Sequence, residues 1–459
     1  MSSSTEIEAL AQDPKPLSFR IRHINKRHTK DDVRKCLENI LKTEQKVVND
    51  IYIEITSAND VGDTTRRVCV VTFHYDGSEP QPAPVHPSCF EQHLREANDE
   101  LMLDIRDGRL WNKRRRRNEN PDDESNYRIT VDKGFRGLTP LYEPENPESV
   151  DANVIAVMGL TPNAYAVWQG EKSDKMWLRH FFEQSDNLKN CRSLIFGYNG
   201  DLWVEALYKK EDYTKGLMED IVEFLRTHPH KPIIFVGHSY GGLLIADMLR
   251  TAYFWRQNPE RYRIYELTKG IFFFATPHRG MFIDDLQKIN SHKYRGEIIQ
   301  GLQKRDLRFD GIFTEELKQF IQVIKEGAIK VYSFAETELT NQLEKSDDSI
   351  RPHQCVEQKH QVDRASAFLA LSGHETEHHA EGKNHRNIIK FDNFDDRTYT
   401  AMLKGLKKCL EYIKQPTDDT VKAKPTRGES PQIAYSHVKL VSYALDETAR
   451  LGAVRESLD

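Results

Sequence analysis

The chain lacks long apolar runs, closely spaced cysteines and a strong excess of charge of either sign. Its apolar stretches are short, such as Gly270–Ala275, whereas a membrane-spanning helix needs about 20 consecutive apolar residues. The sequence therefore predicts no transmembrane segment. A formal net charge of -5 over 459 residues gives no general reason to expect a nucleic acid partner.

The six cysteines lie far apart and form no CxxC pair, which excludes the usual zinc spacings and a dense disulfide framework. We expect them to be reduced thiols in an intracellular protein. Residues Met1–Pro16 hold neither the basic region nor the apolar core of a secretory signal. These features together predict a cytoplasmic location.

Composition divides the chain into four parts, which we predict as residues 1–110, 111–149, 150–415 and 416–459. The first part shows the order strand, helix, strand, strand, helix, with the second helix over Cys89–Leu103. This order predicts a small α+β domain, for which the ferredoxin-like arrangement is one candidate. The second part is charged and proline-rich and predicts a linker. The last part is polar and predicts a flexible tail.

The predicted N-terminal domain raises the question of RNA binding, because RNA-recognition sheets carry base-stacking aromatics on their central strands. Its third strand, Val68–Phe73, lacks the glycine and the paired aromatics of that motif. We therefore favour a docking domain with a protein partner. The basic run Arg114–Arg117 has three interpretations: a solvated linker, a nuclear localisation signal and a patch that binds an anionic surface. We favour the linker because acidic residues follow almost at once.

From Val154 onward, short β-branched runs alternate with helical stretches, which is typical of a parallel sheet built from βαβ units. Residues 232–242 read Pro-Ile-Ile-Phe-Val-Gly-His-Ser-Tyr-Gly-Gly, a G-x-S-x-G motif directly between a strand and a helix. The serine of such a motif occupies a tight, strained turn, in which Gly237 and Gly241 avoid side-chain collisions. The pattern predicts an α/β-hydrolase fold with Ser239 as the nucleophile.

An acyl-transfer site also needs two N–H donors that stabilise an oxyanion. Tyr240, directly after the nucleophile, is expected to supply one of them. The other comes from the loop after the predicted strand Val154–Met158, where Leu160 is the candidate. An ordinary turn at the strand end is the alternative interpretation of this loop.

The acid and the base follow the nucleophile in this fold, in that order. Glu336 ends a late predicted strand and is the first candidate for the acid, with Glu338 and Asp363 as alternatives. His385 lies just before the last predicted helix, where the base is expected. His278 precedes the acid in the chain and is therefore a weaker candidate. Three further histidines lie in a polar stretch that predicts an exposed loop: His374, His378 and His379.

The segment Met281–Gly327 lies between two predicted core strands, where hydrolases of this fold often carry a cap. It mixes apolar and charged residues in the manner of an amphipathic helix. An active-site lid and ordinary helices packed on the sheet both remain open.

Further motifs recur in order through residues 128–412. They are Phe135–Tyr142, Val150–Leu160, Met176–Arg179, Ile195–Tyr198, Ile234–Gly242, Ile271–Met281, Ser333–Glu336, Val362–Ala367 and Asn384–Phe391. In these stretches the chain resembles the lipase-like α/β-hydrolase modules of fungi that often precede STAND-type NTPase domains. It is also similar to the serine-active-site proteins linked to phospholipid handling, the DUF676 group. The resemblance implies Ser239, Glu336 and His385 as the catalytic triad.

Two positions depart from the family pattern. The family has His-Gly-Leu-Gly at the oxyanion loop, where this chain reads Met158-Gly159-Leu160-Thr161, and Tyr240 replaces a usual leucine. The missing histidine normally helps to fix the loop. Our first hypothesis is a serine hydrolase that cleaves an acyl ester of a lipid or phospholipid, without metal or cofactor and with peripheral membrane contact. The alternative is a non-catalytic binding or signalling module of the same fold.

Overall fold

The computed structural model describes residues 17–26, 29–43, 51–75, 130–132, 134–173, 175–200, 208–282, 298–299, 301–303, 315–341 and 358–415. Four predicted features lie outside these residues: the helix Cys89–Leu103, the basic run Arg114–Arg117, most of the predicted cap and the tail 416–459. Within the described ranges, no helix combines the length and the apolar character needed to cross a membrane.

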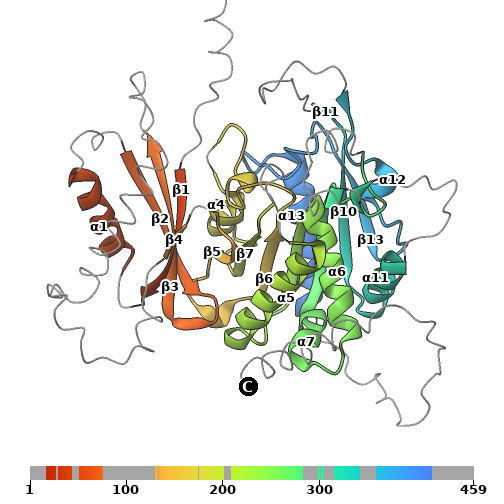
Figure 1. The fold of residues 1–459 in the computed structure, drawn as a ribbon, viewed down its shortest axis with the longest axis horizontal. Coiled ribbons are helices and arrows are strands. Elements are labelled where there is room, and N and C mark those ends of the chain that lie inside the picture. Colours follow the sequence, from red (N-terminus) through yellow and green to blue (C-terminus); the bar gives the residue numbers. More distant parts are fainter. Residues whose placement is uncertain are drawn as a thin grey trace, which may run out of the picture. The chain divides into compact units, whose positions relative to one another are not determined.

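A seven-stranded sheet forms the centre of the larger part of the molecule, with strand order β13-β10-β9-β8-β6-β7-β5 (Figure 1). Its neighbouring strands pair in parallel, except that β5 runs antiparallel to β7 at one edge. The strands are β5 (Gly137–Tyr142), β6 (Ala152–Val157), β7 (Cys191–Gly197), β8 (Ile233–His238), β9 (Thr268–Phe274), β10 (Lys330–Glu336) and β13 (Glu375–Ala380). A two-stranded ribbon, β11 (Thr340–Asn341) and β12 (Gln358–Lys359), lies beyond β10 in the chain.

Helices cover both faces of this sheet (Figure 1). Consecutive residues of a strand point to opposite faces, so Phe273 contacts Phe320 of one helix layer while Phe274 contacts Phe391 on the other side. The first layer holds α5 (Lys210–Thr227), α6 (Tyr240–Phe254), α7 (Pro259–Leu267) and α11 (Glu315–Glu326). The second holds α4 (Trp177–Gln184) and α13 (Arg397–Lys414), and α12 (Arg364–Ala367) is a single turn near β10. This arrangement confirms the predicted α/β-hydrolase fold.

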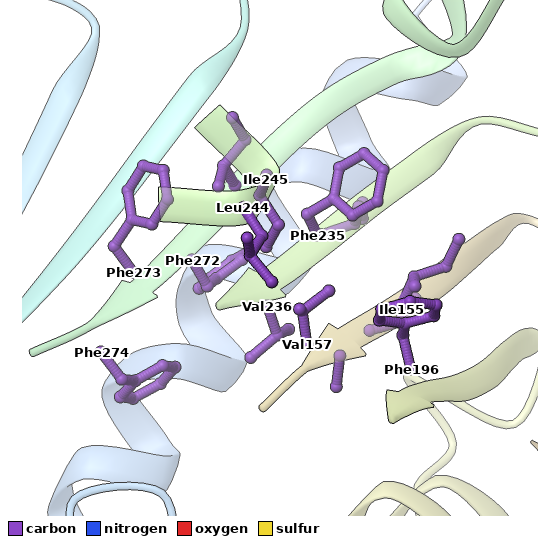
Figure 2. Packing of buried hydrophobic residues seen from close by; sticks show 14 of the residues in the cluster. Ile155, Val157, Phe196, Phe235, Val236, Leu244, Ile245, Phe272, Phe273 and Phe274 are labelled. Carbon is purple, nitrogen blue, oxygen red and sulfur yellow. The ribbon is translucent and has the colours of Figure 1, made fainter. Parts of the chain in front are cut away.

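The central strands β6 and β8 are buried along their whole length, as expected for parallel strands covered on both faces. Figure 2 shows their side chains packed with those of β9 and α6, among them Val157, Val236 and Ile245. Because this packing fixes the strands, it also fixes the loops at their carboxyl ends, where ligands bind in open α/β sheets.

A second, smaller sheet is built from the N-terminal residues and confirms the predicted α+β domain. Its strands are β1 (Leu17–Asn25), β2 (Ile51–Asp60), β3 (Asp63–Tyr75) and β4 (Thr130–Asp132), all antiparallel in the order β2-β3-β1-β4. The helix α1 (Lys30–Thr43) begins at a capping box in which Thr29 N–H donates to Asp32 and Asp32 N–H donates to the Thr29 hydroxyl. The second predicted helix lies outside the described residues, so the ferredoxin-like arrangement stays a prediction.

One face of the N-terminal sheet packs on the hydrolase part through polar contacts. Arg20 of β1 donates to the Thr139 hydroxyl of β5 at 2.7 Å, and Glu54 of β2 accepts from His180 of α4 at 2.9 Å. Burial of Glu54 on its own would raise its pKa, but hydrogen bonds from His180 and His74, together with the charges of Arg179 and His180, outweigh burial and lower the pKa. An RNA-recognition sheet leaves one face open for stacked bases, and here these contacts occupy that face.

The predicted linker over residues 111–149 contains two strands. β4 completes the N-terminal sheet, and β5 forms an edge of the large sheet. Proline usually argues against a strand because it has no N–H for the hydrogen bonds between strands. An edge strand such as β5 pairs on one side only, so it tolerates Pro140. The linker prediction is therefore wrong for Thr130–Asp132 and Gly137–Tyr142, whereas residues 111–129 lie outside the described residues.

The polar stretch that predicts an exposed loop contains the strand β13, which pairs in parallel with β10. Its side chains are mostly half-buried or exposed because β13 is an edge strand. The ring of His378 stacks on Phe334 of β10, with 4.7 Å between ring centroids. Of the predicted cap, α11 packs against α6 as an ordinary helix, and a lid over the remaining residues stays a prediction.

Candidate active site

Ser239 lies in the turn between β8 and α6, at the carboxyl end of the sheet. Its backbone has φ 51° and ψ -125°, a region that L-residues rarely adopt and that stores strain. The Ser239 N–H donates to the Phe274 carbonyl of the neighbouring strand at 2.9 Å. The serine is therefore held in a strained turn at the amino end of a helix, as the G-x-S-x-G motif predicts.

The two motif glycines are required by close backbone contacts. A Cβ on Gly241 would lie 2.3 Å from the carbonyl oxygen of Met158, and a Cβ on Gly237 would lie 2.7 Å from the Cα of Gly242. Both distances are far below normal contact. No side chain larger than hydrogen fits at either position without movement of the backbone.

His385 lies against the serine. Its Nε2 is 2.9 Å from the Ser239 Oγ, which is hydrogen-bond distance, and both side chains are buried. The histidine follows β13, so the edge strand missed in the sequence is the element that brings the base to the nucleophile. The weaker candidate His278 is buried and packs against Phe273 of β9 instead.

Glu336 is the last residue of β10, and its buried carboxylate faces the same histidine. The Glu336 Oε1 lies 3.8 Å from the His385 Nδ1, which is longer than a hydrogen bond. Among the described residues, that Nδ1 has no hydrogen-bond partner. The Glu336 carboxylate instead accepts from the Val362 N–H at 2.5 Å and from the Thr340 hydroxyl at 3.5 Å.

The alternative acids lie elsewhere. Glu338 is exposed, two residues beyond the end of β10. Asp363 caps α12, where its carboxylate accepts from the Ser366 N–H at 2.8 Å. Of the three candidates, the structure brings Glu336 to His385.

The predicted oxyanion loop lies directly against the nucleophile. A Cβ on Gly159 would be 3.0 Å from the Ser239 Cβ, so this glycine permits the close approach of the loop. Leu160 follows it and is partly buried. Tyr240 is the first residue of α6, and the first N–H groups of a helix point out of its amino end, where they favour negative charge.

A second buried histidine, His238, connects the nucleophile turn to the base loop. Its Nε2 donates to the His385 carbonyl at 2.8 Å. Burial, with a smaller effect from His385, lowers the pKa of His238 to about 3, so the ring is neutral near pH 7. Sequence reasoning missed this residue and Thr340. The place of His238 inside the G-x-S-x-G motif was an available signal, whereas Thr340 gave none.

No group of three or more histidine, cysteine, aspartate or glutamate side chains is arranged to hold a metal ion in the parts of the chain that the structure describes. The side chains that the structure brings together at this site are those of a serine, a histidine and a glutamate. A serine in a strained turn at the carboxyl edge of a parallel sheet, in contact with a histidine, defines the class: the chain contains an α/β-hydrolase module.

Comparison with known proteins agrees with this class. Residues 174–305 match the family model described as "Putative serine esterase (DUF676)". Protein SERAC1 of zebrafish (Danio rerio) is 27% identical over 217 residues, which cover 41% of this chain and 31% of that protein. Protein SERAC1 of mouse (Mus musculus) is 30% identical over 233 residues, covering 46% and 35%. The chain thus matches well under two thirds of the length of these relatives.

Among solved structures, the mature lipase BlEst2 of Bacillus licheniformis is 14% identical with a TM-score of 0.37, and the match covers 60% of this chain and 99% of the lipase. The predicted resemblance to DUF676 and serine-active-site proteins is confirmed by the family model and the SERAC1 matches. The association with NTPase domains stays a prediction.

Proposed function

We propose that this protein is a serine hydrolase that cleaves an acyl ester, with Ser239 as nucleophile, His385 as general base and Glu336 as the orienting acid. The observation that carries this proposal is the 2.9 Å contact between His385 Nε2 and Ser239 Oγ in the strained turn. A serine hydroxyl is a weak nucleophile unless an adjacent base takes its proton, and this contact supplies the base.

The reaction proceeds in two steps of acyl transfer. His385 takes the proton of Ser239 as Oγ attacks the ester carbonyl carbon, and then gives it to the departing alcohol. The N–H groups of Tyr240 and Leu160 stabilise the oxyanion of the tetrahedral intermediate. A water molecule, deprotonated by His385, attacks the acyl-enzyme and releases the carboxylic acid with regeneration of the serine.

Glu336 fixes the tautomer of His385 and stabilises its charged form. For that hydrogen bond, the distance of 3.8 Å between Glu336 Oε1 and His385 Nδ1 has to shorten by roughly 1 Å. Catalytic hydrogen bonds are often long in substrate-free sites and shorten when substrate binds. We propose that substrate binding closes this gap.

Exposed apolar side chains support a lipid ester as the substrate. Tyr208, Phe282 and Leu339 are each 38% or more exposed and follow the carboxyl ends of β7, β9 and β10. These ends share the edge of the sheet at which Ser239 lies. Exposed apolar side chains in segments that follow this edge fit an acyl chain or a lipid surface better than a polar ester, and they also support the predicted peripheral membrane contact.

The test is labelling with a fluorophosphonate, read by intact mass, on the wild type and on Ser239→Ala. We expect one adduct per chain in the wild type and none in the variant, with equal thermal unfolding as the control for folding. An adduct that persists in Ser239→Ala would exclude this serine as the nucleophile. Initial rates on short-chain and long-chain p-nitrophenyl esters then test the lipid proposal, which requires the long-chain esters to be preferred.

The second candidate is a binding module that keeps the fold without the reaction. Two observations favour it, the methionine at position 158 and the long distance between Glu336 and His385. A well-folded wild type that neither reacts with the fluorophosphonate nor hydrolyses esters would establish this candidate and exclude the first.

A further inference from the structure

A tyrosine at the end of β7 contacts the oxyanion loop. The hydroxyl of Tyr198 donates to the carbonyl oxygen of Met158 at 3.0 Å, and the tyrosine is buried. Met158 directly follows β6 and is the first residue of the loop. The bond therefore holds the loop at the residue directly before Gly159.

The turn that follows Tyr198 packs against the same loop. A Cβ on Gly200 would lie 2.7 Å from the carbonyl oxygen of Thr161 and 3.2 Å from that of Gly159. The opposite side of the loop contacts the nucleophile, since Gly159 approaches the Ser239 Cβ. The loop is thus enclosed between the turn after β7 and the nucleophile turn.

The tyrosine is itself fixed by a second tyrosine. The ring of Tyr213 in α5 lies 4.7 Å from that of Tyr198, measured between centroids. The Tyr213 hydroxyl donates to the carbonyl of Asn199 at 2.8 Å, within the same turn. These contacts restrict the Tyr198 ring and the turn that follows it. A side chain that is already restricted loses less conformational entropy when its hydroxyl forms a hydrogen bond.

The contact to Met158 determines how the loop presents its N–H groups. A peptide unit is planar, so a fixed Met158 carbonyl also fixes the direction of the Gly159 N–H. Gly159 is the most permissive residue type for backbone rotation, and the next N–H belongs to Leu160, the proposed oxyanion donor. Without a fixed peptide before it, the glycine would let this donor rotate away from the oxyanion.

We propose that Tyr198 is a positioning residue for the oxyanion hole, which holds the loop through the Met158 carbonyl. This inference rests on the proposed hydrolase function. A tyrosine that only stabilises the core would affect folding stability and leave the catalytic step unchanged. The two roles therefore predict different effects of a substitution at Tyr198 on kcat.

The experiment compares Tyr198→Phe with Tyr142→Phe. Tyr142 is a matched control because its hydroxyl also donates to a backbone carbonyl, that of Lys189 at 2.8 Å, but on β5 at the sheet edge. For Tyr198→Phe we expect kcat and the fluorophosphonate labelling rate to fall by about 10-fold to 100-fold, with KM changed by less than about 2-fold. Tyr142→Phe is expected to keep wild-type rates.

Hydrogen exchange at Gly159, Leu160 and Thr161 supplies a readout that does not need activity. We expect faster exchange at these amides in Tyr198→Phe only, with unfolding temperatures compared in parallel. Wild-type rates with wild-type exchange in Tyr198→Phe would overturn the inference, as would an equal loss in Tyr142→Phe. If the wild type shows no labelling, the hydrolase proposal fails and the exchange measurement alone decides whether Tyr198 holds the loop.

Discussion

The Thr340 hydroxyl accepts a hydrogen bond from the His385 N–H at 3.1 Å, and it donates to the Glu336 Oε2 at 3.5 Å. One buried side chain thus connects the backbone of the proposed base to the carboxylate of the proposed acid. Glu336 lies at the end of β10 and His385 lies after β13, so the two residues come from different segments. Thr340 therefore links the segment that carries Glu336 to the segment that carries His385.

Replacing Thr340 by valine removes this connection while keeping the shape of the side chain. We expect kcat on an ester to fall by about 10-fold to 100-fold, because a displacement of about 1 Å in a reacting group costs a factor of this size. Thr340→Ser keeps the hydroxyl and should retain most of the activity. Equal rates in the valine variant and the wild type would show that Thr340 does not position the pair.

Glu336 and Asp363 are distinguished by substitution. Glu336→Gln keeps the volume but removes the charge, and we expect kcat to fall between about 100-fold and about 10,000-fold. Asp363→Ala should leave kcat near the wild type and reduce the free energy of unfolding by about 1 kcal/mol, since the α12 cap is lost. Steady-state kinetics and urea unfolding of both variants check this. The reverse pattern would make Asp363 the acid.

Gly241→Ala places a methyl group 2.3 Å from the carbonyl oxygens of Val157 and Met158. Backbone oxygens of a central strand cannot move aside easily, so we expect a loss of about 3 kcal/mol or more in the free energy of unfolding. Gly216→Ala in α5 is the control, because nothing lies within 4 Å of its added Cβ. That change should stabilise the protein by about 0.5–1 kcal/mol. A well-folded Gly241→Ala protein of wild-type stability would contradict the close contact.

The free energy of unfolding should depend on pH through buried histidines. Burial, with a smaller effect from Arg279, lowers the pKa of His278 to about 3, from an ordinary value of 6.5. Below pH 6.5, His278 binds a proton in the unfolded chain but stays neutral in the folded chain. The free energy of unfolding therefore falls as the pH drops from 6.5 toward 3. Each such histidine contributes up to about 1.4 kcal/mol per pH unit.

The check is denaturant unfolding of the wild type and His278→Gln across this pH range. On acidification, the free energy of unfolding should fall less steeply for the variant than for the wild type. The difference between the two slopes should be at most that of one bound proton, about 1.4 kcal/mol per pH unit. If His278→Gln and the wild type show parallel curves, the imidazole of His278 is not kept neutral by burial.

The core of the fold was predictable because its strands carry one consistent signal. Apart from Asn153 and His238, β6 and β8 consist of apolar residues and glycine, and both strands are buried throughout. The edge strands β5 and β13 were missed for a physical reason, since one side of an edge faces solvent and accepts proline and polar residues. The sequence pattern of such strands is that of a loop, and only the pairing with β7 and β10 distinguishes them.

The residues of the candidate site also divide into those that the sequence indicates and those that it does not. Ser239 was predictable because a strained turn permits few residue types around it, and His385 because chain order and its place before the last helix single it out. The contacts of Tyr198 with Met158 and of His238 with His385 join residues 40 and 147 positions apart. A tyrosine or histidine at such a position has no local pattern that names its partner.

The edge strand β5 determines where the hydrolase part can be separated from the rest of the chain. It precedes residue 150, the start of the hydrolase part as predicted from sequence, and among the described strands it pairs with β7 alone. A fragment cut at residue 150 would leave the backbone N–H and carbonyl groups of β7 open along one side. Open strand edges recruit other chains, so such a fragment would aggregate, and a usable truncation has to keep Gly137–Tyr142.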